Sequence, residues 1–477
     1  MIHSCCTRRD VLSTLACGFG MLAFKGLFCD SATAGEEINP LAPKPVHFPA
    51  RAKRVIFLFM RGGPSHMDTF DYKPKLQAEN DKPLPFALPK LQVTQKRNLG
   101  KLMGSPFKWK QHGECGLWVS ELFPHIAKHA DDLCVINSMH TDGIDHGQAT
   151  NRLHTGQDIF IRPSLGSWVV YGLGSENKSL PGFISLSPAK GEMGNRSMTS
   201  AFLPAAFQGT PVGGEGVAAK DAKIRNIANT RISSAEQRRQ LDFLQTMNAA
   251  HQERAQDDLR LQGMIDAFDL AYRMQGEVPK IMDISTESPE TQKLYGVGDE
   301  LTDNFGRQCL TARRLAEAGV RFIQITHGNS SPFPAWDQHG NLKAGLEYNA
   351  SRTDQPIAAL LTDLKARGML QDTLVLWGGE FGRTPVTEGR GGSFGRDHNP
   401  YGFTMWMAGG GVKGGLRYGQ TDDYGYYAVE NKVHMHDLHA TLLHLLGLDH
   451  EKLTYRYAGR DFRLTDVYGH AVRDILA

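Results

Sequence analysis

The sequence carries little net charge and few cysteines. Its formal net charge is +2, and it has no long run of lysine or arginine. Nothing in its composition therefore indicates a protein that binds nucleic acid or an anionic membrane. Of seven cysteines, only Cys115, Cys134 and Cys309 lie beyond residue 34, and none belongs to a C-x-x-C pair. A disulfide scaffold and a cysteine-rich metal site are excluded, and one disulfide bond is the most that could form.

Beyond its first 34 residues the chain also lacks an apolar segment that could cross a bilayer, which takes roughly 20 residues. The first 34 residues are different. Paired arginines in TRRD, residues 7–10, precede an apolar stretch, and ATA at 32–34 offers small residues for cleavage. This order predicts a secretory signal of the twin-arginine type, and hence a periplasmic or extracellular protein. The alternatives are an uncleaved anchor and lipidation at Cys17 or Cys29.

The rest of the chain alternates buried strands with helices. Apolar runs at 55–60 and 133–138 predict strands, and helices are expected near 120–130 and from about 164. The stretches LTARRLAEAGVRFIQITHG and DQPIAALLTDLKARGMLQDTLVLW each predict a helix, a glycine stop and a strand. This alternation predicts an α/β fold over residues 51–477, with a doubly wound, mostly parallel sheet flanked by helices.

Three segments differ from this alternation. Residues 35–50 are polar and rich in proline and are expected to form a linker. Residues 72–118 show little periodicity and are expected to be a long excursion. Residues 215–300 are rich in Gln, Arg, Asp and Ala, with apolar residues at helical spacing opposite a charged face. A helical insertion, either a hairpin or a cap, is predicted there.

Polar side chains gather where the predicted strands end. Arg61 follows the first strand, at a place where a carboxylate is common. The segments after the other strands and the GRDH segment hold Asp142, Asp145, His146, His154, His327, Asp337, His339, Glu380, Arg383, Asp397 and His398. Because ligands bind beyond the carboxyl ends of parallel strands, these side chains are expected to converge. Imidazole and carboxylate together suit zinc, manganese or iron, and a site of three protein ligands leaves an open position.

The motifs also carry a resemblance. In chain order they are a strand followed by GGPSHMDTF, then WDQHG, GEFGRTP, GRDH and AGGGVKGG. Over about residues 50–470 this order resembles the bacterial domain-of-unknown-function family fifteen-oh-one, which is grouped with the sulfatases and alkaline phosphatases. The resemblance implies an alkaline-phosphatase-like α/β fold. It also implies two metal sites that are bridged by the attacked phosphate or sulfate.

The resemblance also assigns roles to residues. Asp337, His339 and His398 fall where one metal site takes an Asp and two His. Arg61 and the pair Glu380-Phe381 stand where the second site takes its ligands, so that site is altered. His146 stands at the position of the nucleophilic serine of alkaline phosphatases. The C/S-x-P-S-R motif of sulfatases does not occur in the chain.

Two principal hypotheses of function remain. The first is a hydrolase of phosphate or sulfate esters with one divalent metal ion, zinc foremost, bound by Asp337, His339 and His398. The catalytic set would be His146 as nucleophile or general base, with Arg61, Arg383 and Glu380. The substrate would be a small anionic ester or a sulfated polysaccharide.

The second hypothesis is a non-catalytic protein of the sulfatase fold that binds anionic or sulfated polymers at the cell envelope. In that case Arg61 would pair with Glu380 and fill the emptied metal position. A structural protein of the envelope is a third class.

Three other residues receive ordinary interpretations. Ser65 is expected to be a helix N-cap rather than a nucleophile. Trp336 is expected to form a wall beside Asp337. His436, which shares a helical face with His439, is expected to be structural rather than a metal ligand.

Overall fold

The computed structural model describes residues 41–87, 100–225, 227, 231–252, 259–328, 333, 335–390 and 393–477. The predicted signal at 1–34 and the first part of the predicted linker lie outside these residues, so export stays a prediction. Among the described residues no helix combines the length and the apolar character needed to span a membrane. Cys115, Cys134 and Cys309 are all free, so the one disulfide that the sequence allowed is not formed.

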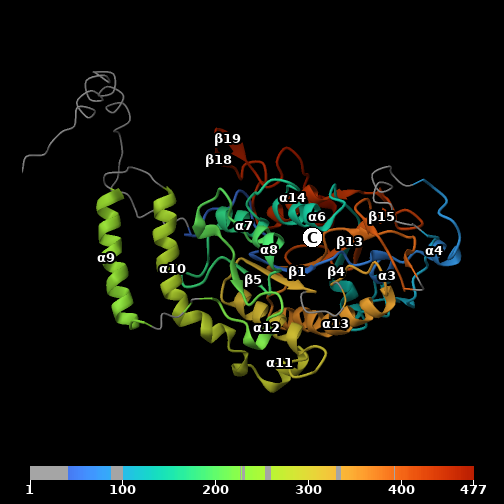
Figure 1. The fold of residues 1–477 in the computed structure, drawn as a ribbon, viewed down its shortest axis with the longest axis horizontal. Coiled ribbons are helices and arrows are strands. Elements are labelled where there is room, and N and C mark those ends of the chain that lie inside the picture. Colours follow the sequence, from blue (N-terminus) through green and yellow to red (C-terminus); the bar gives the residue numbers. More distant parts are fainter. Residues whose placement is uncertain are drawn as a thin grey trace, which may run out of the picture. The chain divides into compact units, whose positions relative to one another are not determined.

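The described part of the chain is built on a mixed, mostly parallel sheet of nine strands (Figure 1). In spatial order it contains β14 (Leu416–Tyr418), β4 (Leu133–His140), β13 (Phe403–Ala408), β8 (Thr373–Gly378), β1 (Arg54–Met60), β7 (Phe322–His327), β5 (Phe183–Leu186) and β6 (Thr210–Val212), and β17 (Val433–His434) pairs with β4. The central strands are buried almost throughout, as expected for a sheet that is covered on both faces. The predicted α/β fold class is confirmed.

Strand direction brings the candidate residues to one edge of the sheet. β1 runs parallel to β7 and β8, and β5 runs parallel to β7. β13 is antiparallel to both β8 and β4, so β4 points the same way as β1. The carboxyl ends of β1, β4, β7 and β8 therefore share an edge with the amino end of β13. The sequence did not predict that β13 runs the opposite way.

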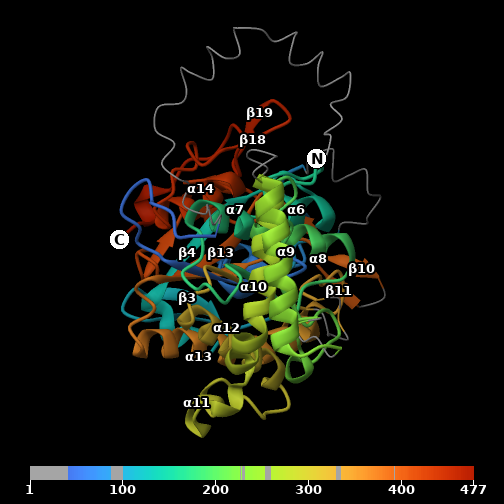
Figure 2. The ribbon, with the colours of Figure 1, turned by 90° about the vertical axis from the view of Figure 1, so that its left-hand side faces the viewer.

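Helices cover both faces of this sheet (Figures 1 and 2). On one face lie α6 (His146–Thr155), α7 (Leu165–Leu173) and α14 (Met435–Leu445). On the other lie α12 (Asp303–Glu317) and α13 (Leu342–Ala366). The predicted glycine stops are present, because Gly319 and Gly368 follow α12 and α13 with φ of +91° and +69°.

The remaining elements are short or belong to connections. The helices are α3 (His66–Thr69), α4 (Pro74–Ala78), α8 (Gly191–Ser197) and α11 (Pro289–Leu294), with 3-10 turns at Ile126–Asp132, Ala205–Phe207, Ala219–Asp221, Ile284–Thr286 and Arg473–Ile475. Two-stranded pairs are β2 (Trp109–His112) with β3 (Leu117–Ser120), β9 (Gly382–Arg383) with β12 (His398–Asn399), β10 (Glu388–Arg390) with β11 (Ser393–Gly395), β15 (Gln420–Thr421) with β16 (Ala428–Glu430), and β18 (Tyr455–Tyr457) with β19 (Arg460–Phe462).

The helix predicted near 120–130 is only a 3-10 segment at Ile126–Asp132, and β3 ends where the helix was expected to begin. Its backbone leaves helical geometry at His129, so the segment is two short turns and not one helix. Local propensity is a weak guide that tertiary packing can override.

The predicted insertion does contain two long helices, α9 (Ser234–Gln252) and α10 (Leu259–Met282). They lie next to each other in Figure 1. The apolar residues of α9 do not form a buried face, because Phe243, Leu244 and Met247 are 65%, 49% and 56% exposed. The division of the chain into domains stays a prediction.

The centre of the core is aromatic. Trp377 of β8 stacks on Trp406 of β13 with ring centroids 5.8 Å apart and planes 4° from parallel. Phe70 and Trp336 meet Trp377 edge-on. This cluster lies beneath the edge of the sheet where the candidate residues gather. It therefore holds β8 and β13 together, and the segments that carry candidate residues adjoin these two strands.

We expect Trp406→Ala to lower the free energy of unfolding by about 3–5 kcal/mol, because it removes a large buried ring. The measurement is urea denaturation followed by circular dichroism. Val467→Ala is the control, because Val467 is 68% exposed and its loss should change stability by less than about 0.5 kcal/mol. Equal effects of the two changes would contradict the assignment of Trp406 to the core.

Candidate functional site

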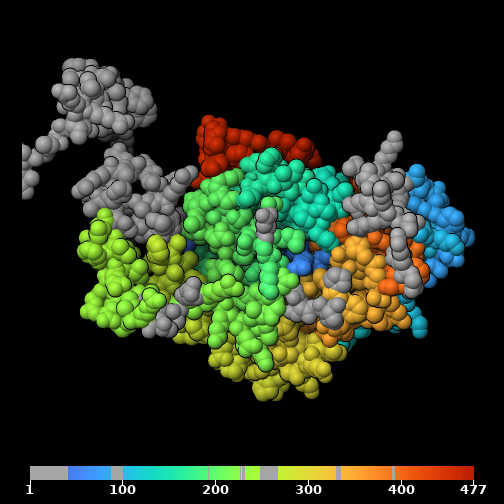
Figure 3. All heavy atoms as spheres, viewed as in Figure 1, coloured from blue at the N-terminus to red at the C-terminus, as the bar shows by residue number. Residues whose placement is uncertain are grey.

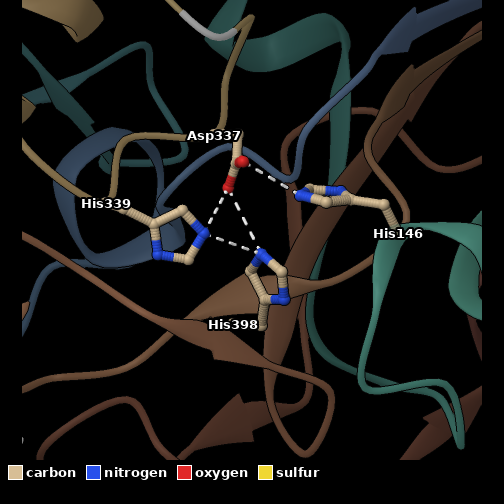
Figure 4. A group of neighbouring side chains, drawn as sticks. All are labelled: His146, Asp337, His339 and His398. Atoms are coloured by element: carbon tan, nitrogen blue, oxygen red, sulfur yellow. Dashed lines mark hydrogen bonds and ion pairs between the residues drawn. The ribbon is translucent and has the colours of Figure 1, made fainter. Parts of the chain in front are cut away.

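Four side chains meet at the shared edge of the sheet (Figure 4). His146 begins α6, just after β4, and Asp337 and His339 follow β7. His398 lies in β12, shortly before the amino end of β13. Their candidate ligand atoms all lie within 4.8 Å of one another. In Figure 3, blue atoms from the part of the chain around β1 are visible between green and orange segments, so this part reaches the surface there.

One carboxylate oxygen of Asp337 and one ring nitrogen from each of His339 and His398 form a tight triangle. Oδ1 of Asp337 lies 2.9 Å from Nε2 of His339 and 3.2 Å from Nε2 of His398. The two Nε2 atoms are 3.0 Å apart. His146 approaches the other oxygen, with Nε2 3.1 Å from Oδ2 (Figure 4). His339 and His398 therefore contact Oδ1 of Asp337, and His146 contacts Oδ2.

Each imidazole is held by an acceptor at its other nitrogen. Nδ1 of His398 lies 3.1 Å from the carbonyl oxygen of Ile144. Nδ1 of His339 lies 2.5 Å from Oε2 of Glu388, and Nδ1 of His146 lies 2.7 Å from Oε1 of Glu380. A carbonyl oxygen can only accept, so His398 must donate from Nδ1. In the neutral rings, Nε2 is then the atom that bears a lone pair toward Asp337.

This arrangement fits a bound metal ion. Two Nε2 lone pairs and a carboxylate oxygen lie about 3 Å apart, which is unfavourable unless positive charge is shared among them. Tetrahedral zinc with bonds of about 2.0–2.1 Å holds its ligand atoms about 3.3 Å apart, close to the spacing found here. Acceptors behind ligating histidines are the usual means of fixing their orientation. The donor set matches zinc, and it also suits other first-row divalent ions.

The double glycine after β1 allows the loops to approach this closely. Gly62 has a φ of +111°, and a Cβ there would lie 2.7 Å from the backbone nitrogen of Asp337. Its own N–H donates to both carboxylate oxygens of Glu380, at 3.0 and 3.1 Å. Glu380 is fully buried, and it thus links the end of β1 to His146. A side chain at position 62 would push Asp337 away from the histidines.

Arg383 fixes the same loops from within the protein. Its side chain is buried and donates to the carbonyl oxygens of Gly62, Gly63 and Arg396. It also donates to Oδ1 of Asp337 at 2.5 Å. These contacts occupy the guanidinium within the protein, and a catalytic role for Arg383 stays a prediction. In the structure Arg383 positions Asp337.

Arg61 occupies a different place from the one the second hypothesis gave it. Its guanidinium lies 3.4 Å from a carboxylate oxygen of Glu215, in the segment before α9. Glu380 bonds to His146 and Gly62, so the pairing of Arg61 with Glu380 is wrong. A role of Arg61 in binding substrate stays a prediction.

Electrostatics favour ionised carboxylates at this edge. Burial raises the pKa of the Asp337 carboxyl, but the hydrogen bonds that the three histidines donate when protonated, together with the charge of Arg383, hold that pKa well below its usual range. Burial likewise raises the pKa of Glu380, and its bond to His146 brings it below the ordinary value. Burial lowers the pKa of His146, yet its bonds to Asp337 and Glu380 raise it to about 9. The site therefore attracts positive charge.

The sequence also matches a family model described as "Protein of unknown function (DUF1501)" over residues 52–476. The chain belongs to the DUF1501 family. No curated protein matches it. The family that the sequence motifs resembled is confirmed.

Solved structures similar to this DUF1501 chain were also found. One is PsFucS1 sulfatase from Pseudoalteromonas sp., at 13% identity and a TM-score of 0.36, with 84% of this chain and 69% of that chain covered. Another is a mutant of TAB5 alkaline phosphatase, at 12% identity and a TM-score of 0.33, with 84% of this chain and 99% of that chain covered. A third is the phosphonate monoester hydrolase SpPMH from Silicibacter pomeroyi, at 13% identity and a TM-score of 0.32, with 74% of this chain and 71% of that chain covered.

Other candidate residues of the DUF1501 chain have local roles. Asp145 accepts a hydrogen bond from the backbone of Gln148 and caps α6. Asp142 pairs with Arg152 and His434. Further afield, Nδ1 of His154 bonds to the carbonyl of Thr150, and Nε2 of His436 and of His439 bond to the carbonyls of Gly156 and Leu153. None of these five lies in the group of four.

Trp336 is fully buried, as expected of a wall, and its indole N–H donates to His327 at 3.0 Å. Phe381 packs against the site itself. Its ring lies 5.0 Å from that of His146 and 4.4 Å from that of His398. An apolar ring thus occupies the position where the resemblance puts a second-site ligand.

A buried ion pair beneath the site was not predicted. Arg396 and Asp68 are both fully buried and lie 2.8 Å apart. Arg396 is two residues before His398, so the pair anchors the segment of His398 to α3. Ser65 stands at the N-cap of α3, but its hydroxyl donates to Asp68 and makes no cap bond, so the expected capping contact is wrong.

We expect Asp68→Asn to lower the free energy of unfolding by about 3–5 kcal/mol, because it leaves the buried charge of Arg396 without its carboxylate. Urea denaturation measures the change. Combining it with Arg396→Met should lose less than the sum of the two single changes. Glu347→Gln is the matched control, since Glu347 belongs to an exposed pair with Lys343 at 3.8 Å. It should lose less than about 1 kcal/mol, and a loss at Asp68 no larger than this would refute the anchoring role.

Proposed function

We propose that the chain is an exported, metal-dependent hydrolase of phosphate or sulfate esters, with one metal ion bound by Asp337, His339 and His398. The observation that carries this proposal is the triangle of Oδ1 and two Nε2 atoms, each about 3 Å from the others. Export rests on the signal predicted in the first 34 residues. Zinc is the ion that best suits two imidazoles and a carboxylate.

Three protein ligands leave an open position at a metal ion, which is the pattern of catalytic rather than structural sites. A divalent ion held there would supply Lewis-acid polarisation of an ester oxygen. The role of the protein is to keep the ligands in place. Glu388 and the Ile144 carbonyl orient the two histidines, and Arg383 orients Asp337.

His146 is proposed as the general base. It lies beside the triangle and approaches Oδ2, the oxygen that the other histidines do not contact. Glu380 accepts from Nδ1, so a proton taken from an attacking hydroxyl or water would go to Nε2. With a pKa of about 9 the ring is charged at neutral pH, and a metal ion beside Asp337 would lower that pKa and free Nε2 for this role. A base oriented by a buried carboxylate is a recurring arrangement in hydrolases. Direct attack by His146 on the ester is the other role open to the same atom.

One observation favours a second function. Nε2 of His146 belongs to the group of four potential ligand atoms, all within 4.8 Å. If His146 completed the coordination, the site would be closed, as in structural zinc sites. The chain would then be a non-catalytic protein that binds anionic or sulfated polymers. The two functions differ in what the loss of His146 does to bound metal.

The mature protein, purified without added metal, is expected to contain about one divalent ion per chain. Asp337→Ala and His398→Ala should each remove most of it, because each takes away one of three ligands. Inductively coupled plasma mass spectrometry gives the stoichiometry. His470→Ala, at an exposed histidine outside the group, should leave it unchanged. A parent protein without stoichiometric metal would end the proposal, and so would metal retained in full by the His398 variant.

His146→Gln is expected to lower kcat for aryl phosphates or aryl sulfates about 10²–10⁴-fold, the usual contribution of a general base. Metal content should stay at the parent level. His470→Gln is the matched control for both measurements. If His146→Gln releases the metal instead, His146 is a ligand and the closed, non-catalytic site is favoured. A covalent phosphohistidine trapped in the parent and absent from the variant would make His146 the nucleophile.

A further inference from the structure

The loop between α6 and α7 exposes three large apolar side chains in succession. They are Ile159, Phe160 and Ile161, which are 63%, 62% and 60% exposed. The loop follows the end of α6 that is opposite to His146, so these side chains are not part of the candidate metal site. Single exposed apolar residues are ordinary, but a contiguous group of them indicates an interaction surface.

Arg162 joins this loop to the hairpin of β18 and β19. Its guanidinium carbon lies 4.2 Å from the ring centre of Phe462 in β19 and 5.8 Å from that of Phe160. The ring of Tyr457, which is also exposed, lies 6.4 Å from that of Phe462. The hairpin projects beyond the helices next to it (Figures 1 and 2). Ile159, Phe160, Ile161 and Tyr457 therefore form one surface, here called the apolar patch.

Arg162 gives the apolar patch a positive charge. The acidic residues of the loop, of the hairpin and of the turn after it all pair with other arginines. These pairs are Asp158 with Arg152, Asp461 with Arg456, and Asp466 with Arg460. Arg162 itself has no ion-pair partner in the part of the chain that the structure describes, and its contacts are aromatic rings. Its charge is thus available to an anion outside the protein.

The arrangement of the apolar patch suits a lipid bilayer. In helices and strands alike, neighbours in sequence point in different directions, so a rigid partner on one side does not cover three consecutive side chains. Fluid acyl chains surround a projecting loop on every side. A tyrosine is favoured at the level of the headgroups, because its ring is apolar and its hydroxyl is polar. An arginine can keep its guanidinium at the same level, where the lipid phosphate supplies the anion.

From these contacts we propose that Ile159, Phe160 and Ile161 insert into the surface of a phospholipid bilayer, with Arg162 on a lipid phosphate group. This inference goes beyond the proposed function, because it concerns the surface to which the protein binds and not the bond that it cleaves. The small net charge of the chain is compatible with it, since apolar burial supplies most of the binding and one local arginine adds to it.

Co-sedimentation of the mature protein with vesicles tests the proposal. The vesicles are phosphatidylcholine with about one quarter phosphatidylglycerol, and the protein is expected to sediment with them. Replacement of Ile159, Phe160 and Ile161 together by serine should weaken the binding at least about tenfold, because their apolar surface is no longer buried in lipid. The melting temperature should stay the same, since all three side chains are exposed.

The matched control replaces three other exposed apolar residues by serine. Phe243, Leu244 and Met247 of α9 are exposed to a similar extent, and their replacement should leave vesicle binding within about twofold of the parent.

Tryptophan fluorescence tests insertion directly. Phe160→Trp should show fluorescence that vesicles with brominated acyl chains quench, after subtraction of the signal of the parent protein. Phe243→Trp, on α9, should show no such quenching. Equal quenching of the two would contradict insertion of the loop.

Arg162→Gln tests the phosphate contact. It should weaken binding to the same vesicles about fivefold, the usual contribution of one arginine near an anionic bilayer. Lys343→Gln removes the same charge from an exposed position of α13 and should leave binding within about twofold. Unchanged binding in Arg162→Gln would reject the phosphate contact.

A parent protein that does not sediment with vesicles would overturn the proposal, and so would parental binding in the triple serine variant. Sedimentation velocity distinguishes the other occupant. A dimer that the triple serine variant lacks, in a protein that does not bind vesicles, would assign the apolar patch to a second copy of the chain and reject the bilayer. None of these measurements reads metal content or hydrolysis, so failure here and failure of the proposed function are distinguishable.

Discussion

The close approach of three lone-pair atoms around Asp337 is the constraint on which the site depends. Oδ1 of Asp337 and the Nε2 atoms of His339 and His398 would repel one another without shared positive charge. Their surroundings hold them there. Glu388 and the Ile144 carbonyl fix the two rings, and Arg383 fixes the carboxylate. The fold already orders these side chains, so binding a cation costs little further conformational entropy. A cation therefore gains most of its binding energy from the ligands themselves.

Much of the architecture could be predicted from sequence because it depends on local patterns. The apolar runs of β1 and β4 and the two helix–glycine–strand units are readable from periodicity and turn residues. The convergence of His146, Asp337 and His398 followed from the rule that parallel strands end at one edge. The choice among several histidines needed the family resemblance, since a histidine at a strand end looks the same whether or not it faces a ligand.

The contacts that sequence reasoning missed are set by tertiary packing. The Ile144 carbonyl has no side-chain signal, and Glu388 lies in a short hairpin that no periodicity marks. The second hypothesis paired Arg61 with Glu380, but in the structure Arg61 pairs with Glu215, from a segment whose path the sequence does not specify. Asp68 and Arg396 are 328 positions apart, and a charged pair that is fully buried runs against the usual placement of both residue types.

The reversed direction of β13 has a consequence for how the chain folds. Its amino end joins the edge where the candidate residues gather, and β13 lies between β4 and β8, so His398 depends on this strand for its place. The bonds that complete the site span 234 positions between His146 and Glu380 and 254 between Ile144 and His398. Loop closures of this length form late, after local helices and hairpins. The assembled site is thus a reporter of complete folding, and nascent chains that contain His398 but not β13 lack the strand that adjoins its segment.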